Sequence, residues 1–177
     1  MGAKCCRGKE KYPHLFSPIR IGNIRMKNRI IAAPTSPSMI TTEGHFTPEM
    51  IAYLEEKALG GAGVVTYGEA IVHSATGKSH NKQLQLDSFG VKQGMAEASR
   101  AIHNAGAYAN IQLSHGGKYG GLVSVGGDQG CCETAYGPSY EMTPAGEVFE
   151  MPKELILELV DSYRTGAKLC KDCGFAM

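Results

Sequence analysis

The sequence has 177 residues, of which 42% are hydrophobic and 20% are charged, so it is long enough for one domain with its own core. Its 18 basic and 17 acidic side chains leave a net charge of +1, which provides no broad field to attract nucleic acid or an anionic membrane. The longest uninterrupted apolar run covers residues 30–33, far short of the ~20 residues of a spanning helix, so neither kind of partner is expected.

The first eleven residues are predicted to be a flexible N-terminus ahead of a folded domain at residues 12–177. The N-terminal stretch is charged and lacks the apolar centre of a secretory signal. We therefore expect a cytoplasmic protein whose six cysteines are thiols. Gly2 and the Cys5-Cys6 pair leave a weak alternative, which is acylation of the N-terminus.

A β-hairpin is predicted over residues 15–28. Apolar and polar residues alternate on both sides of Gly22-Asn23, a dipeptide typical of tight turns. We expect this hairpin to cap one end of a sheet.

Three short apolar runs then alternate with longer segments of helical spacing. The runs are predicted strands at residues 29–34, 64–67 and 108–113, and the second of them leads into residues 68–70. This order is typical of successive strand and crossover-helix units on a parallel sheet, so the fold class is α/β.

The first connecting helix is predicted to start at Thr47-Pro48, where a hydroxyl cap precedes proline, and to end at a glycine run from Gly60. The second is predicted over residues 89–105. Both carry apolar residues at three- and four-residue spacing. The positions expected to face the core are Ile51, Leu54 and Ala58 in the first helix and Val91, Met95, Ala98, Ile102 and Ala105 in the second.

Residues 116–150 hold nine glycines and show no clear period, so they are predicted to form a long loop of the kind that is often functional. Pro152 opens a last helix, and residues 173–177 are expected to begin a fourth strand. The expected buried stripe of the last helix is Leu155, Ile156, Leu159, Val160, Tyr163 and Ala167.

Parallel sheets bind ligands at the carboxyl ends of their strands, which makes residues 33–36, 68–70 and 112–115 the informative segments. Gln112 is the most informative residue, because a carboxamide offers one donor and one acceptor group and so matches the amide edge of a flavin pyrimidine ring. A glutamine that only satisfies loop backbone is the alternative explanation.

Four motifs, in this order, resemble the Old Yellow Enzyme family across most of residues 12–177. They are L-F-S-P-I-R-I-G at residues 15–22, K-N-R-I-I-A-A-P at 27–34, G-E-A at 68–70 and I-Q-L-S-H-G-G at 111–117. The resemblance implies the amino-terminal part of an FMN-binding (β/α)₈ TIM barrel. It also implies an oxidoreductase that takes a hydride from NADH or NADPH and reduces a C=C bond conjugated with a carbonyl, in an unsaturated carbonyl compound or an enoyl thioester.

The resemblance also implies roles for single residues. The backbone at Pro34 and Thr35 is expected to lie against the isoalloxazine ring, with the Ser36 hydroxyl near flavin O4. Ala70 is expected to be the small residue beneath the ring, and Gln112 to contact its pyrimidine edge. The expected cofactor-binding set is Ala33, Pro34, Thr35, Ser36, Ala70 and Gln112, and no metal site is expected.

The sequence departs from the family pattern at two positions and at its end. Lys118 stands where the family more often has arginine, and Ser114 where many relatives have a large aromatic residue. The histidine pair that holds the substrate carbonyl in the family lies at the end of strand four. The catalytic residues are therefore unknown in this chain and are expected after Met177.

A TIM barrel needs at least ~200 residues, so we interpret the chain as an amino-terminal fragment that is truncated at strand four. Its uncovered barrel edges would favour self-association. The alternative is a catalytically inert fragment or isoform with at most weak flavin binding or a protein-association role. A third hypothesis is another flavin or phosphate barrel, such as a dihydroorotate-type oxidase.

Two further patterns are interpreted as structural. Cys170 and Cys173 have the spacing of metal ligands, but no second pair lies near them, so they are expected to pack between a helix and a strand. Gly77-Lys78-Ser79 resembles a phosphate loop, but Val72 stands where that motif requires glycine.

Overall fold

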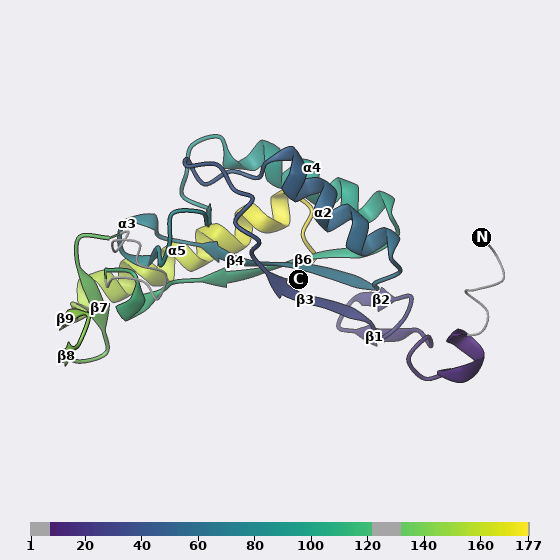
Figure 1. Ribbon diagram of the computed structural model, residues 1–177, viewed down its shortest axis with the longest axis horizontal. Coiled ribbons are helices and arrows are strands. Elements are labelled where there is room, and N and C mark those ends of the chain that lie inside the picture. The colour runs from purple at the N-terminus through teal and green to yellow at the C-terminus, as the bar shows by residue number, and fades with distance from the viewer. Residues whose placement is uncertain (1–7, 122–131, 177) are drawn as a thin grey trace.

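A parallel sheet forms the centre of the protein (Figure 1). The computed structural model describes residues 8–121 and 132–176. Strands β3 (Ile31–Thr35), β4 (Val64–Ile71) and β6 (Tyr108–Ser114) lie side by side in that order, and the short β5 (Leu84–Gln85) pairs with the end of β4. The three predicted strands are therefore confirmed, and β4 is longer than expected because it continues through residues 68–70.

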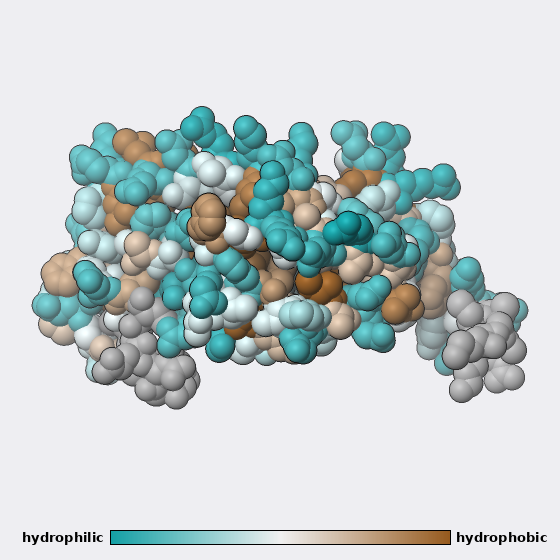
Figure 2. Space-filling model, turned by 90° about the horizontal axis from the view of Figure 1, so that it is seen from above, coloured by the Kyte–Doolittle hydropathy of each residue, from teal (hydrophilic) through white to brown (hydrophobic). Residues whose placement is uncertain are grey.

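Helices α2 (Pro48–Leu59) and α4 (Val91–Asn104) cover one face of this sheet (Figure 1). Thr47 caps α2 as predicted, because its hydroxyl accepts a hydrogen bond from the Met50 N–H at 3.2 Å. Seen from the side of these helices, the surface is largely hydrophilic with apolar patches between polar side chains (Figure 2). The single turn α3 (Ser74–Gly77), which follows β4, was not predicted.

The main core lies between these helices and the sheet. Each large side chain buried there stabilises the fold by about 1.5–3 kcal/mol relative to its exposure to water. Ile51 and Ala105 pack against this core partly buried. Among its buried members are Met50, Leu54 and Ala58 of α2, Val91, Met95, Ala98 and Ile102 of α4, and Val65, Tyr67, Ala70, Ala109 and Ile111 of the sheet.

The structure confirms the predicted hairpin and its turn at Gly22-Asn23. Strands β1 (Ile19–Ile21) and β2 (Ile24–Met26) pair antiparallel, and Gly22 adopts a φ of 55° in the turn between them. A positive φ is open to glycine at little cost. The hairpin lies beside the amino-terminal end of β3 (Figure 1). Residues 8–11 form one helical turn, and residues 1–7 of the predicted flexible N-terminus lie outside the described residues.

The segment predicted as a long loop contains regular structure. It begins with the 3₁₀ turn η1 (Gly117–Tyr119) and continues into a small sheet of β7 (Ala135–Gly137), β8 (Glu141–Thr143) and β9 (Gly146–Glu150). Strands of three to five residues are too short for an alternating pattern to stand out in sequence. Residues 122–131 of this predicted loop lie outside the described residues.

The predicted stripe of the last helix, α5 (Lys153–Asp172), is wrong for most of its members. Only Leu159 of the six is fully buried, whereas Ile156 and Val160 are 47% and 61% exposed. The helix packs instead through Gly166, where an added Cβ would lie 3.2 Å from Leu86 Cδ1, and through Cys170. A glycine allows this close approach but contributes nothing to an apolar pattern. Among the described residues, no helix is long and apolar enough to span a bilayer.

The fourth strand predicted at residues 173–177 is not present in residues 173–176, which form a turn and an irregular segment. One hydrogen bond joins this segment to β6, from the Ala176 N–H to the Ala109 carbonyl at 2.8 Å. Met177 lies outside the described residues.

Truncating a core leucine of α2 tests the assigned core. Leu54 is 0% exposed, so Leu54→Ala is expected to lower the free energy of unfolding by about 2–5 kcal/mol through lost burial and a residual cavity. Urea unfolding followed by circular dichroism measures this change. Leu59→Ala, in the same helix but at a 61% exposed position, is the control and should change the free energy by less than about 0.5 kcal/mol. Equal effects would contradict the assigned packing.

Candidate functional site

The carboxyl ends of β3, β4 and β6 leave polar and small residues uncovered on the face of the sheet opposite α2 and α4. Pro34 at the end of β3 and Gln112 near the end of β6 are both exposed. Because the three strands are parallel, these ends meet at one edge of the fold. This edge is where parallel sheets place their ligands.

Gly68 of β4 brings these two residues together. A Cβ built on Gly68 would lie 2.6 Å from Gln112 Oε1 and 2.8 Å from Pro34 Cβ, which is closer than real Cβ atoms approach. The proline ring of one neighbouring strand and the carboxamide of the other therefore close over a position without a side chain. Gly68 itself is buried beneath them, so Pro34 and Gln112 form the exposed surface at this point, which we call the Gly68 step.

Ala70 lies on the opposite face, which corrects its expected position. Its side chain is 0% exposed, belongs to the main core and pairs in register with Leu113. The register of β4 against β6 shifts between Tyr67 and Ala70, and a one-residue shift reverses the face of every later side chain. Gly68, and not Ala70, lies between Pro34 and Gln112. A glycine inside a strand is a known signal of a bulge or close backbone approach, and this signal was overlooked.

Thr35 and Ser36 are held from the helix side of the sheet. Lys57 of α2 donates to Thr35 Oγ1 at 2.6 Å, so this threonine side chain is engaged by the fold. The Ser36 hydroxyl lies 3.5 Å from the hydroxyl of Tyr67, which is fully buried. Burial raises the pKa of Tyr67, while hydrogen bonds from Ser36 and from the backbone of Leu84 oppose this. Either hydroxyl of this pair can be the donor.

A polar network fixes the end of β4 next to Gly68. Glu69 Oε2 accepts a hydrogen bond from the Ser114 hydroxyl of β6 at 3.1 Å, and Oε1 accepts one from the Gln83 side chain. Gln83 is 0% exposed, and its Oε1 accepts the backbone N–H groups of Ser79 and His80 at 2.9 and 3.2 Å. A carboxylate at the candidate site is therefore held by defined donors. The sequence indicates Glu69 only as a strand-end residue and Ser114 as a strand-end residue that departs from the family pattern, and it gives no signal for Gln83.

The two family departures also have defined positions. Ser114 is the Glu69 partner described above. Lys118 forms an ion pair with Glu141 of β8 at 3.1 Å, which ties η1 to the small sheet. His115 is bonded to Thr76 and Gly117 rather than turned toward the Gly68 step.

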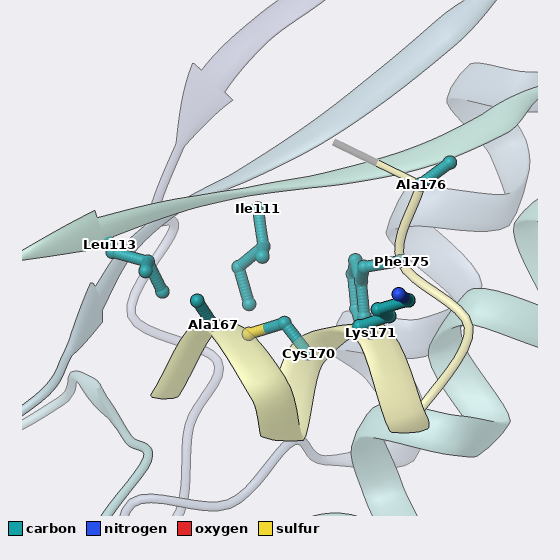
Figure 3. A pocket seen from close by; sticks show the side chains of 7 residues that line it. All are labelled: Ile111, Leu113, Ala167, Cys170, Lys171, Phe175 and Ala176. Carbon is teal, nitrogen blue, oxygen red and sulfur yellow. The ribbon is translucent and has the colours of Figure 1, made fainter. Parts of the chain in front are cut away.

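A second hollow, on the helix side of β6, is unsuited to a polar ring. Ile111 and Leu113 of β6 face Ala167 and Cys170 of α5 across a pocket of about 360 Å³ (Figure 3). Its lining is mostly apolar, and burial raises the pKa of the Cys170 thiol to about 12. Cys170 and Cys173 are both buried in the main core, as expected for packing residues.

Comparison with known proteins gives consistent matches over nearly the whole chain. The family model described as NADH:flavin oxidoreductase / NADH oxidase matches residues 14–177. The chain is 29% identical over 150 residues to an NADH oxidase of Thermoanaerobacter brockii, covering 85% of this chain and 22% of that protein. The chain therefore spans less than a quarter of that relative.

Solved structures match as well. A 2-naphthoyl-CoA reductase in complex with 2-naphthoyl-CoA aligns with a TM-score of 0.82 at 30% identity, covering 93% of this chain and 26% of that one. An Old Yellow Enzyme from Pichia sp. aligns with a TM-score of 0.81 at 21% identity, covering 93% and 44%, which shows the likeness of fold. The α/β architecture is thus similar to the corresponding part of these proteins.

Removing the amide of Gln83 tests the network around Glu69. Gln83→Leu leaves the Ser79 and His80 N–H groups and the Glu69 carboxylate without their buried partner, so we expect a loss of about 1–3 kcal/mol in the free energy of unfolding. Chemical denaturation measures it. Gln93→Leu removes an exposed amide that bonds only to Glu97 and is the matched control. A loss no larger than that of the control would show that the network contributes nothing.

Proposed function

The chain belongs to the NADH:flavin oxidoreductase / NADH oxidase family, and on that premise we propose that it supplies the flavin-facing strands of an FMN-dependent oxidoreductase. The resemblance to the Old Yellow Enzyme family is confirmed by the family match. Because the chain spans only part of its relatives, the activity, cofactor and substrate of the whole protein are stated here as proposals.

The observation that supports flavin binding is the step at Gly68. A planar ring needs a flat surface to lie against. Gly68 has no side chain, so the Pro34 ring and the Gln112 carboxamide can close over it and form such a surface. The exposed Gln112 carboxamide offers a donor and an acceptor to the polar edge of such a ring. The residues that would hold FMN are Ala33, Pro34, Thr35, Ser36, Gly68 and Gln112, with Gly68 in place of Ala70.

The chemistry that FMN supplies when bound is acceptance of a hydride from NADH or NADPH and its delivery to an electron-poor C=C bond. This chain's residues would set the surroundings of that exchange. Tyr67, by donating to Ser36, would leave the Ser36 hydroxyl hydrogen free for the cofactor. A donor held in this way favours negative charge on the group that it faces.

The proposed substrate is an unsaturated carbonyl compound or an enoyl thioester. The 2-naphthoyl-CoA reductase at 30% identity, solved with its thioester, supports this class. Ser114, at the end of β6, is a small residue whose hydroxyl bonds to Glu69, so no bulky side chain projects from this strand end. No residue of this chain is assigned to hold the substrate carbonyl.

Flavin retention tests the Gly68 step directly. Gly68→Ala is expected to weaken FMN binding at least tenfold, or about 1.4 kcal/mol, because its Cβ meets the rigid Pro34 ring at 2.8 Å. Gln112→Leu removes both hydrogen-bonding groups and should have a similar effect. Fluorescence titration of each variant with FMN gives the dissociation constants.

The matched controls are Gly94→Ala and Gln93→Leu, which lie on α4 away from the site. A Cβ at Gly94 meets its nearest neighbour, Phe46 Cβ, at an ordinary 3.5 Å. Both controls should bind FMN as the unaltered chain does. If all four variants bind equally, or if the unaltered chain binds no FMN, the assigned site is wrong.

Turnover separates the proposal from its alternatives. With FMN bound, an active protein should lose its visible flavin absorbance on anaerobic mixing with NADH or NADPH and regain it with an enone or enoyl thioester. A chain that binds FMN but shows neither change, compared with free FMN, would match the inert alternative. Reoxidation by none of these acceptors would favour another flavin barrel, such as a dihydroorotate-type oxidase.

A further inference from the structure

One continuous run of side-chain hydrogen bonds joins the segments that follow β4 and β6. The Gly117 N–H of η1 donates to His115 Nδ1 at 3.0 Å, and His115 Nε2 lies 2.9 Å from the Thr76 hydroxyl of α3. The same hydroxyl lies 2.8 Å from His73 Nδ1. His73 Nε2 in turn lies 3.3 Å from a carboxylate oxygen of Glu158 on α5.

The two ends of this run fix the position of every hydrogen in it. A backbone N–H is always a donor, so His115 Nδ1 must accept and the neutral ring carries its proton on Nε2. That proton is donated to Thr76, whose own hydroxyl hydrogen is left for His73 Nδ1. The remaining His73 proton, on Nε2, faces the Glu158 carboxylate, which is an acceptor. Both rings are therefore held as their Nε2–H tautomers.

The packing around His115 is too close to absorb a change in this pattern. A Cβ on Gly77 would lie 2.6 Å from His115 Cδ2, so the imidazole lies directly against the backbone of α3. The Gly116 N–H donates to the Gly77 carbonyl at 2.8 Å, and a Cβ on Gly120 would lie 2.5 Å from the Thr76 carbonyl oxygen. Glycines thus allow α3 and η1 to touch through their backbones.

We propose that His73, Thr76 and His115 are positioning residues that clamp η1 against α3, and that a proton on His115 Nδ1 opens this clamp. Such a proton would face the Gly117 N–H, donor against donor, and would remove the acceptor that orders the whole run. The two clamped segments directly follow the strands that carry Gly68 and Gln112. Only the link to a flavin site rests on the proposed function, since the clamp itself is defined without a cofactor.

The charged groups around the clamp set the sign of its pH dependence. Burial lowers the pKa of His115, and the neighbouring His73 lowers it further. Lys118 on η1 is paired with Glu141, Glu158 on α5 faces His73, and Asp87 accepts the Ser74 N–H at the start of α3. A histidine whose pKa is lower in the folded state binds fewer protons there than in the unfolded chain. The clamp's contribution to stability is therefore fully present above the ordinary imidazole pKa of about 6.5, and it is lost as the pH falls from there through the lower pKa of folded His115.

Nuclear magnetic resonance of the 177-residue chain tests the clamp without a cofactor. At pH 7.5 the ring-nitrogen shifts of His73 and His115 should show neutral Nε2–H tautomers. The Gly117 amide should exchange with solvent at least tenfold faster at pH 5 than at pH 7.5, after correction for intrinsic exchange chemistry. An Nδ1–H tautomer of His115, or unchanged protection of Gly117, would overturn the proposal.

Variants of Thr76 provide a second arm. Thr76→Val removes the hydroxyl and should raise Gly117 exchange about tenfold at pH 7.5, whereas Thr76→Ser should restore protection. Thr165→Val, at an exposed position of α5, is the matched control and should change nothing. If Thr76→Val fails to fold, the serine variant and the pH series still decide the outcome. A chain that shows the clamp but binds no FMN would refute the proposed function and leave the clamp intact.

Discussion

The register shift in β4 between Tyr67 and Ala70 is the constraint on which the candidate site depends. Before the shift, Val65 and Tyr67 face the helices, and Gly68 lies on the other face beneath Pro34 and Gln112. After it, Ala70 faces the core again. One extra residue thus presents a position without a side chain between Pro34 and Gln112 and still returns the strand to the apolar cluster. A regular strand would place Ala70 on the open face, and its methyl group would occupy the surface.

The same shift explains the polar network at this edge. Where a ladder is interrupted, buried polar groups need partners other than the neighbouring strand. Gln83, which is fully buried, bonds to the Glu69 side chain of β4 and to the backbone N–H groups of Ser79 and His80 in the loop that follows α3. The end of β4 is therefore fixed by side chains from a loop and from β6, and not by strand pairing alone. Ordered surroundings of this kind are what a ligand site needs if it is to hold a rigid ring in one orientation.

The two faces of the central sheet differ in composition and in role. The face toward α2 and α4 is apolar and supplies stability, whereas the opposite face keeps small and polar residues at the strand ends. Glycine contacts between α3 and η1 extend this edge into the small sheet of β7, β8 and β9. Membership of the NADH:flavin oxidoreductase / NADH oxidase family agrees with this division, because the chain matches the part of its relatives that contains these strands.

The sequence by itself determined the local elements and the family. Local elements depend on residues close together in the chain, so their patterns can be recognised in the sequence alone. Examples are the hydroxyl cap at Thr47, the Gly22-Asn23 turn, the helical spacing of α4 and the strand at Tyr108–Ser114. Only the tertiary structure decided which side chains share a face. The register of β4 decides that Gly68, and not Ala70, lies between Pro34 and Gln112. Contacts between distant segments decide which residues of α5 are buried and which partners Gln83 and His115 bond to. Periodicity assumes an unbroken ladder and one uniform partner surface, and neither condition holds at the end of β4 or along α5.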